Sequence, residues 1–415
     1  MKSVGILNLG CPRNIVDAEN TLGRLIKKGY KVTDLDKADV AIVNTCAFIE
    51  EAKKESIEAI LDLAQLKKEG RLKKIIVAGC LSQRYKDKLR KELPEVDAFV
   101  GALKLGQAER RFAITPRHYA YLKICESCIN NCSFCVIPKI KGRFTSLDIN
   151  STLRQVRALN KEKISELNII GQDISGYGLD LYGKRKLPDL LKKIVKEAGD
   201  IGWIRVLYLY PDKIVDELLE VIKDEPKICK YIDLPIQHIN DRVLKLMNRR
   251  SNKKDIIALI NKVRKVIPDV AIRTSLIVGF PTETEKEFQE LLDFIQEMKF
   301  ERLGAFAYSR EEGTKAFGLS GQIAQKEKIA RLNEVMQLQK EVSEIVNRGF
   351  LGQVMQVLIE EKGKDYYLAR SQYDAPEVDG NVFVRPKKQA FKIGSFIKVK
   401  ITDTLEYDLV GEAIK

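Results

Sequence analysis

The sequence predicts an α/β protein of three domains: an N-terminal open parallel α/β sheet, a central partial (βα)6 barrel and a C-terminal small β-barrel. Three observations predict this architecture. Apolar strands and helices alternate over residues 1–105, and a linker follows at 106–117. Between residues 118 and 347 strands and helices alternate again, over six units. From 348 to 415 short strands are separated by turns, which is typical of a small β-barrel.

Composition indicates a soluble globular protein. Of 415 residues, 31% are charged and 45% hydrophobic, and no uncharged apolar run reaches the roughly 18 residues of a membrane helix. The N-terminus has the pattern of a strand and not of a signal peptide, so we expect a cytoplasmic protein. Its eight cysteines are then metal ligands or buried thiols and not disulfides. The net charge of +14 favours an anionic partner such as RNA or a ribosome, although lysine-rich surfaces also occur without one.

Three short apolar runs suited to a buried parallel sheet predict the first domain. They are Val4–Asn8, Val40–Asn44 and Lys74–Ala78, and helical patterns follow at Ile15–Lys28, Phe48–Lys68 and Ser82–Leu93. A cysteine stands directly after each strand: Cys11, Cys46 and Cys80. Ligands gather at the carboxyl ends of such strands, so we expect the three thiols to converge. A single strand-end cysteine is usually a small buried hydrophobe. Three at equivalent positions favour an iron–sulfur cluster with one open iron.

A second set of thiols follows the first barrel strand: Cys128, Cys132 and Cys135, with the spacing C-x3-C-x2-C. A 4Fe–4S cluster that only carries electrons takes four thiolates. Three would leave one iron free to bind another molecule. The alternative is a zinc knuckle, but zinc sites favour C-x2-C pairs with a second pair at a distance, which the sequence lacks. Cys125 and Cys229 are interpreted as buried structural thiols.

Six barrel strands are predicted, at Tyr119–Ile124, Glu166–Ile170, Trp203–Leu209, Tyr231–Leu234, Ala271–Val278 and Arg302–Ala307. The helices between them are predicted at Asp148–Asn160, Leu187–Ala198, Lys213–Lys223, Asp241–Ile267 and Glu285–Met298. An amphipathic helix at Ile323–Asn347 is expected to close the open side. Six units fall short of the eight of a full barrel, so we expect a lateral opening for a large substrate, with the chemistry at the carboxyl ends of the strands.

Polar residues and a glycine occupy or flank these strand ends: Gln172, Asp173, Asp233, Gln237 and Gly279, while Arg273 lies on the fifth strand. Each is weak evidence alone, because Gly and Asp at strand ends are often only turn residues. The two histidines, His118 and His238, are interpreted as hydrogen-bonded structural residues.

Together these motifs resemble the methylthiotransferase family of radical S-adenosyl-L-methionine (SAM) enzymes. The resemblance covers nearly the whole chain, through Leu-Gly-Cys11-Pro-Arg-Asn, Asn44-Thr-Cys46, Gly79-Cys80, the C-x3-C-x2-C loop, Gly171-Gln-Asp, Asp233-Leu-Pro-Ile-Gln-His238 and Gly279-Phe-Pro. One departure is Thr282, where the family pattern usually has Gly. The resemblance implies an N-terminal three-cysteine domain, a radical SAM core and a C-terminal TRAM domain.

The resemblance also implies the cofactors. One 4Fe–4S cluster, on Cys128, Cys132 and Cys135, would cleave SAM to a 5′-deoxyadenosyl radical. A second 4Fe–4S cluster, on Cys11, Cys46 and Cys80, would hold sulfur, and a second SAM would supply the methyl group. The residues expected to contact SAM are Phe134, Gln172, Asp173, Gln237, Arg273 and Gly279.

Two stretches resemble the family branch that methylthiolates the β-carbon of an aspartate in small-subunit ribosomal protein 12: Tyr308-Ser-Arg-Glu-Glu-Gly-Thr314 and Ala369-Arg-Ser-Gln-Tyr-Asp-Ala-Pro-Glu-Val-Asp-Gly380. Residues Gly352 to Lys415 include ten Lys or Arg and ten Asp or Glu, so the net charge of this segment is zero. An RNA-binding module should instead be basic. Six C-terminal acids could face a basic ribosomal protein or be ordinary turn residues: Asp374, Glu377, Asp379, Asp403, Glu406 and Asp408.

The expected partner is therefore ribosomal protein 12 or the small ribosomal subunit, with an unidentified electron donor and sulfur source. We expect a monomer and no membrane association. Two alternatives stay open at this stage. One is the family branch that modifies an adenosine beside the tRNA anticodon, and the other is an RNA-binding protein whose clusters are structural or redox-sensing.

Overall fold

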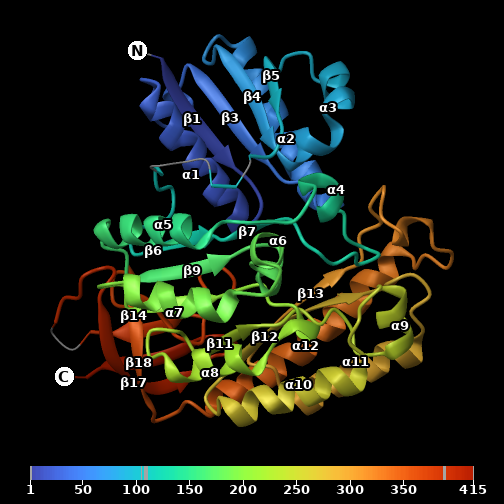
Figure 1. Cartoon of the computed structure of the whole chain (residues 1–415), viewed down its shortest axis with the longest axis vertical. Helices are drawn as coiled ribbons and strands as arrows, with labels where there is room; N and C mark the ends of the chain where they lie inside the picture. Colours follow the sequence, from blue (N-terminus) through green and yellow to red (C-terminus); the bar gives the residue numbers. More distant parts are fainter. Residues whose placement is uncertain (1, 104, 107–110, 387–388, 415) are drawn as a thin grey trace.

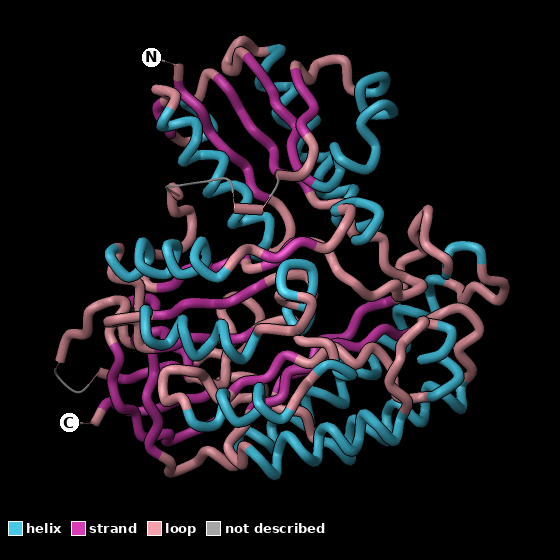
Figure 2. The backbone as a smooth tube through the Cα atoms, viewed as in Figure 1, coloured by secondary structure: helices cyan, strands magenta, loops and turns pink. Residues whose placement is uncertain are grey.

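The computed structural model describes residues 2–103, 105–106, 111–386 and 389–414. A parallel sheet with its helices lies at the top of Figure 1, a split barrel sheet in the middle, and a small closed barrel at the lower left. Figure 2 shows that helices cover the outside of the central strands. The predicted α/β architecture is confirmed. No helix among the described residues is long and apolar enough to span a membrane.

The N-terminal sheet is parallel throughout, in the order β2-β1-β3-β4-β5. Its strands are β1 (Ser3–Asn8), β2 (Lys31–Val32), β3 (Val40–Thr45), β4 (Lys74–Gly79) and β5 (Ala98–Val100), and its helices are α1 (Pro12–Lys27), α2 (Glu50–Lys68) and α3 (Cys80–Glu92). The central strand β3 is buried along its whole length, as its unbroken apolar run predicts. The sequence did not predict β2 and β5, because two or three residues are too few to show an apolar pattern.

The central domain consists of two parallel three-stranded sheets, β10-β9-β6 and β11-β12-β13, linked by a bridge between Ile204 and Ile228. Its strands are β6 (Tyr119–Lys123), β9 (Glu166–Ile170), β10 (Trp203–Val206), β11 (Tyr231–Asp233), β12 (Ala271–Val278) and β13 (Arg302–Ala307). A short antiparallel pair, β7 (Cys125–Glu126) and β8 (Thr145–Ser146), flanks the cysteine loop. Within the described residues β6 and β13 have no further strand beside them, so the barrel is open laterally.

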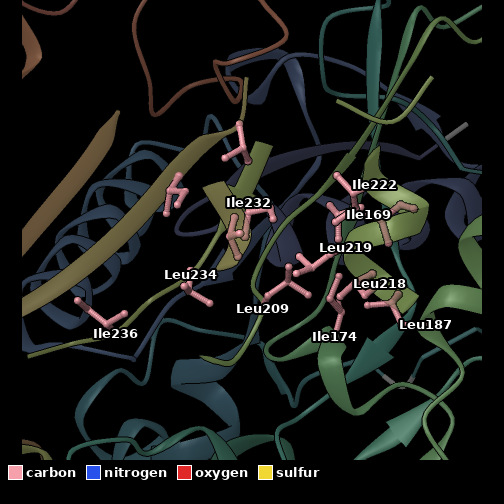
Figure 3. Close-up of a cluster of buried hydrophobic side chains, with 14 of the residues drawn as sticks. Ile169, Ile174, Leu187, Leu209, Leu218, Leu219, Ile222, Ile232, Leu234 and Ile236 are labelled. Carbon is pink, nitrogen blue, oxygen red and sulfur yellow. The ribbon is translucent and has the colours of Figure 1, made fainter. Parts of the chain in front are cut away.

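The helices of this domain are α4 (Ile137–Lys141), α5 (Ile149–Lys161), α6 (Leu179–Tyr182), α7 (Leu187–Glu197), α8 (Asp216–Asp224), α9 (Asp241–Leu246), α10 (Lys253–Val266) and α11 (Glu285–Met298). The single helix predicted at Asp241–Ile267 is wrong. Asn248 adopts a left-handed φ of 57°, and a capping box between Asn252 and Asp255 starts α10 afresh. Branched side chains from the strands meet leucines and isoleucines of the helices in one core, as Figure 3 shows for Ile169, Ile232, Leu218 and Ile222.

The C-terminal strands form a closed barrel in the order β14-β15-β16-β18-β17. They are β14 (Val354–Lys362), β15 (Tyr367–Ser371), β16 (Val382–Arg385), β17 (Phe396–Thr404) and β18 (Leu409–Ala413), and helix α12 (Gln325–Arg348) precedes them and packs on β13 and α11. Of the predicted linker, residues 107–110 lie outside the described residues. Its second half is held on α1, because Glu19 accepts hydrogen bonds from Arg111 and from the amide of Ile114.

The loop between β15 and β16 enters the central barrel at the end where its strands begin. Arg302 donates to Asp374 at 2.8 Å, and the hydroxyl of Tyr231 donates to Asp379 at 2.6 Å. The hydroxyl of Tyr119 donates to Glu377 at 2.7 Å. The side chains of Asp374 and Asp379 are buried by these contacts, so these two acids neither face a partner protein nor act as ordinary solvated turn residues, whereas Glu377 is still exposed.

Candidate metal centre

Three strand ends bring Cys11, Cys46 and Cys80 together at the lower edge of the N-terminal sheet. Cys11 precedes the first residue of α1, Cys46 follows β3, and Cys80 begins α3. Gly10, with a φ of 87°, allows the close approach: a Cβ on it would lie 2.7 Å from the Cβ of Cys46. The predicted convergence of these thiols agrees with this geometry.

The charges around these thiols differ. Burial raises the pKa of Cys46 and raises that of Cys80 to about 12, and a neighbouring Cys11 thiolate adds to both effects. Burial would also raise the pKa of Cys11, but the positive charge of Arg13 and the hydrogen bonds from Asn14 and Arg13 lower it below its ordinary value. Cys11 is thus the thiol of this group that ionises most readily.

The second group of thiols lies in the loop between β7 and α4. The amide and the side-chain nitrogen of Asn130 approach the sulfur of Cys128 at 3.4 and 3.3 Å. Asn130 also donates to Asp173 at 2.7 Å, and the buried amine of Lys213 binds both residues, at 2.7 and 2.8 Å. This network fixes the loop, because each buried polar group in it has a partner.

Cys132 lies beside a cation and a phenol. Its sulfur is 3.8 Å from both the hydroxyl of Tyr210 and Nη1 of Arg249. The Arg249 guanidinium stacks 4.0 Å from the Tyr210 ring centroid, and its other nitrogen donates to the carbonyl of Pro235. Burial raises the pKa of Cys135 to about 12, so this site also needs a positive centre if its thiols are to ionise.

Cys125 belongs to the packing of the barrel. It is fully buried, and its sulfur contacts the carbonyl of Asp173 at 3.6 Å. A Cβ on Gly171 would lie 2.4 Å from this sulfur, so only glycine fits at this position without displacing Cys125. Cys229 is also buried, in an aromatic cluster with Tyr231 and Trp203.

The residues expected to contact SAM are distributed unevenly around the cysteine loop. Asp173 and Gln172 lie beside it, since Asp173 is bound to Asn130 and Gln172 donates to Glu126 at 2.9 Å. Phe134 lies within the loop and packs on an apolar cluster with Phe280 and Tyr308. Gln237, with a φ of 74°, bridges to Leu276 of β12.

Two of the expected SAM contacts have other neighbours. Gly279 is in close contact with helix α12, because a Cβ on it would lie 2.4 Å from Cγ of Lys328. Arg273 is bound to Asp233 and Asp379, and within the described residues it forms no hydrogen bond or ion pair with the cysteine loop. His238 is buried, with a pKa lowered by burial to about 4, and it accepts a hydrogen bond from the amide of Asn240, as a structural histidine does.

Sequence reasoning missed the polar interface that joins the two thiol groups. Arg13 of α1 crosses from the N-terminal sheet to the barrel, donates to the carbonyl of Gly171 at 2.9 Å and stacks 4.4 Å from the Tyr208 ring centroid. The motif that contains Cys11 and Arg13 was recognised, but only the tertiary structure shows Arg13 close to the barrel strand ends. Its guanidinium forms no ion pair with a described carboxylate, and the sulfur of Cys11, when ionised, is the anion that acts on it most strongly.

Two further ion networks hold the N-terminal domain over the barrel. In the first, Asp17 of α1 pairs with Lys123 and Lys141, and Glu126 accepts from the same lysines at 2.6 and 3.2 Å. Burial opposes the charge of Glu126, but the two lysines lower its pKa to about 2.

In the second network, Glu311 binds Lys53 at 3.1 Å and Arg84 at 2.7 Å, and Arg84 also donates to the carbonyl of Ala47 beside Cys46. The two networks therefore fix the N-terminal domain, with its thiols, on the central domain.

The donor set fits iron–sulfur clusters better than a single ion. Among the described residues no three Cys, His, Asp or Glu side chains are close enough to hold one metal ion. A zinc ion holds its sulfur ligands at about 2.3 Å and would draw them together. A cube of four irons binds its thiolates further apart, and cysteines beside Arg13, Arg249 and Asn130 suit an anionic cluster.

Comparison with known proteins agrees with this reading. Residues 3–101 match the uncharacterized protein family UPF0004, residues 122–295 the radical SAM superfamily and residues 351–414 the TRAM domain. The radical SAM methyltransferase TsrM from Kitasatospora setae, with cobalamin and a 4Fe–4S cluster, superposes with a TM-score of 0.51 at 14% identity, over 76% of this chain and 74% of that one. The cobalamin-dependent radical SAM enzyme OxsB gives 0.52 at 13% identity, over 82% and 56%. These similarities show the shared fold.

Closer relatives match along the full length. The ribosomal protein uS12 methylthiotransferase RimO of Thermoanaerobacter sp. (strain X514) is 48% identical over 99% of this chain and 100% of its own. The RimO of Clostridioides difficile (strain 630) is 44% identical over 100% and 99%. With this identity over the whole length, the chain belongs to the RimO family of radical SAM methylthiotransferases.

Proposed function

We propose that this protein transfers a methylthio group to the β-carbon of an aspartate in ribosomal protein uS12. The observation that carries the proposal is that Arg13, beside Cys11, reaches the carbonyl of Gly171 in the central domain, where its charge also acts on Cys135 of the second three-cysteine group. The uS12 methylthiotransferases that match along the whole chain support the substrate. The C–H bond at the β-carbon of an aspartate is too weakly acidic for an ordinary base to remove its proton. Radical chemistry at an iron–sulfur cluster does not need such a base.

In this proposal Cys128, Cys132 and Cys135 hold the 4Fe–4S cluster that binds SAM, and Cys11, Cys46 and Cys80 hold a second cluster that carries the sulfur. When bound, SAM and its cluster supply the one-electron chemistry that removes hydrogen from an unactivated carbon. Three thiolates leave one iron of each cluster open, and an open coordination position is what a binding or catalytic metal site requires.

The surrounding residues have definable roles. Lys213, Asn130 and Asp173 keep the cysteine loop in one conformation, since together they satisfy one another in a buried network. Arg249, whose Nη1 lies 3.8 Å from the sulfur of Cys132, would supply a cation that can bind the carboxylate of SAM. Arg13 stabilises negative charge at Cys11 and orients the N-terminal thiols toward the barrel.

The remaining partners follow from the same proposal. The enzyme needs an electron donor and a sulfur source, and it meets uS12 free or in the small ribosomal subunit. We propose a monomer that works in the cytoplasm, where the thiols stay reduced.

The test is to reconstitute the protein with iron and sulfide, reduce it, and supply SAM with either uS12 or unmodified and prenylated tRNA. Mass spectrometry should find a methylthio group on a uS12 aspartate and none on tRNA. A variant with Cys128 changed to Ala serves as the control for radical chemistry. Modified tRNA with unmodified uS12 would contradict the proposed substrate.

A further inference from the structure

The hydrogen bonds from Arg273 to carboxylates are longer than those of Arg205 and Arg302, which also lie inside the barrel. Its Nη1 is 3.4 Å from Asp233 and its Nε 3.3 Å from Asp379. By contrast, Arg302 and Arg205 each bind a carboxylate at 2.8 Å. Within the described residues Nη2 of Arg273 donates no hydrogen bond. A guanidinium can bind a carboxylate through two parallel hydrogen bonds, so one edge of Arg273 is still available.

The available edge of Arg273 faces space left by a glycine. Strands β12 and β13 pair with Ser275 opposite Gly304 and Ile277 opposite Phe306, so alternate residues share one face. A Cβ on Gly304 would lie 3.8 Å from Nη2 of Arg273 and 3.9 Å from the Phe306 ring. These are ordinary contacts, and Gly304 has no left-handed φ. Neither the backbone nor crowding requires glycine at this position.

Gly304 lies on a strand at the edge of the split barrel sheet. Strand β13 is the outer strand of the sheet β11-β12-β13, and no other described strand pairs with it. Such an edge presents backbone donors and acceptors to an extended segment of another protein. Phe306, which is 52% exposed, stands on the same strand two residues beyond Gly304 and offers an apolar contact.

We propose that Arg273 and Gly304 form a carboxylate-binding subsite that receives the side chain of the substrate aspartate. The segment that carries the aspartate lies along the open edge of β13 and packs on Phe306. This inference rests on the proposed function and deepens it, because it names the residue that distinguishes an aspartate from an uncharged side chain. A neutral amide in place of the carboxylate would lose the charged hydrogen bonds.

The first test fills the space. Gly304→Val should raise the KM for uS12 roughly tenfold or more, because the added methyl groups occupy the place of the substrate side chain. Gly318→Val is the matched control, since a Cβ on the exposed Gly318 meets nothing within 4 Å. Both variants should keep the iron content and unfolding temperature of the unchanged protein. Gly304→Val with an unchanged KM for uS12 would overturn the subsite.

The second test removes the charge. Arg273→Gln should raise the KM for uS12 roughly tenfold to a hundredfold, the loss expected for a charged hydrogen-bonded pair. With uS12 whose target aspartate is changed to asparagine, the binding affinity should be weak and the same for Arg273→Gln as for the unchanged protein. An equal loss on both forms of uS12 would show a structural role and overturn the inference.

A third measurement separates the possible ligands. If Arg273 binds the carboxylate of SAM instead, Arg273→Gln will raise the KM for SAM in cleavage without uS12, and the subsite is overturned. If the unchanged enzyme leaves uS12 unmodified, the proposed function is wrong, and the subsite has no substrate aspartate to bind. If the unchanged enzyme modifies uS12 and both Gly304→Val and Arg273→Gln act normally, only the subsite fails.

Discussion

At the scale of single residues, small differences in environment separate ligands from packing residues. Cys125 and Cys128 are three positions apart, yet Cys125 is fully buried against Asp173 while Cys128 is half-buried and receives hydrogen bonds from Asn130. Hydrogen bonds to sulfur favour a thiolate, and apolar burial disfavours one. Sequence spacing and hydrogen bonding to sulfur therefore both distinguish Cys128 from Cys125.

This difference predicts the outcome of two alanine substitutions. Cys128→Ala should lose the cluster on that loop and abolish SAM cleavage. Cys125→Ala should keep the iron content and cost on the order of 1 kcal/mol of unfolding free energy, the usual cost of a small core change. Iron analysis and 5′-deoxyadenosine formation under strong reductant check both variants. Loss of iron in Cys125→Ala with full iron in Cys128→Ala would contradict the ligand assignment.

Thr282 is a strained residue where the family pattern has glycine. Its φ is 67°, a left-handed conformation that is costly for a β-branched residue. Its hydroxyl accepts a hydrogen bond from Arg242 at 3.0 Å, which offsets part of that cost. We expect Thr282→Gly to raise the free energy of unfolding by about 0.5–1 kcal/mol, while Thr282→Ala, which keeps a Cβ, should not stabilise. Urea unfolding of the three proteins checks this, and a less stable Thr282→Gly protein would show that the hydrogen bond outweighs the strain.

At the scale of elements, the C-terminal barrel is fixed to the central one through β14 and the loop after β15. Glu360 of β14 lies 3.0 Å from His118 and receives a hydrogen bond from Arg370 of β15 at 2.7 Å. Arg370 in turn pairs with the buried Glu166 of β9. Buried ion pairs of this kind are costly to break, because one charge is then left without a partner.

This network predicts a pH dependence. Burial would raise the pKa of Glu360, but the hydrogen bond from His118 and the charge of Arg370 lower it from 4.5 to about 2. Because the folded-state pKa is the lower one, the stabilisation is complete above about pH 4.5 and is lost as the pH falls toward 2. Glu360→Gln should lower the unfolding free energy at neutral pH by on the order of 2 kcal/mol and weaken this dependence. Urea unfolding of the apoprotein between about pH 5 and pH 3 checks it, and equal pH slopes for both proteins would contradict it.

At the scale of the whole molecule, the N-terminal domain is clamped over the barrel at two places. Asp17, Lys123, Glu126 and Lys141 form one buried network, and Glu311 with Arg84 and Lys53 forms the other. The two groups of thiols nevertheless come from different sheets. Each can therefore be removed without removing the other.

Changing Cys11, Cys46 and Cys80 together to Ala should roughly halve the iron content, because one of two clusters of equal size is lost. SAM cleavage should persist, since the loop at Cys128 keeps its network with Lys213, and methylthio transfer should vanish. Iron analysis, 5′-deoxyadenosine formation and mass spectrometry of uS12 measure the three results. Continued methylthio transfer by the triple variant would contradict the two-cluster proposal.

The sequence by itself determined the fold class, the six barrel strands and the two sets of cysteines. Unbroken apolar runs identify buried parallel strands, and thiols at fixed spacing are recognisable without any coordinates. The periodic pattern of apolar residues predicted a wrong helix where a turn interrupts that pattern without changing it. The run from Asp241 to Ile267 looks like one helix, because nothing in its apolar period reveals the left-handed turn at Asn248.

Only the tertiary structure decided which charged groups meet. The C-terminal acids Asp374 and Asp379 have the composition of a surface loop, yet they bind arginine and tyrosine inside the barrel. Motifs single out Arg13 and Arg273 in the sequence, but their neighbours come from segments far along the chain and only the structure identifies them. Ion pairs across such separations leave no periodic signal, because they depend on how sheets and loops pack and not on the order of nearby residues.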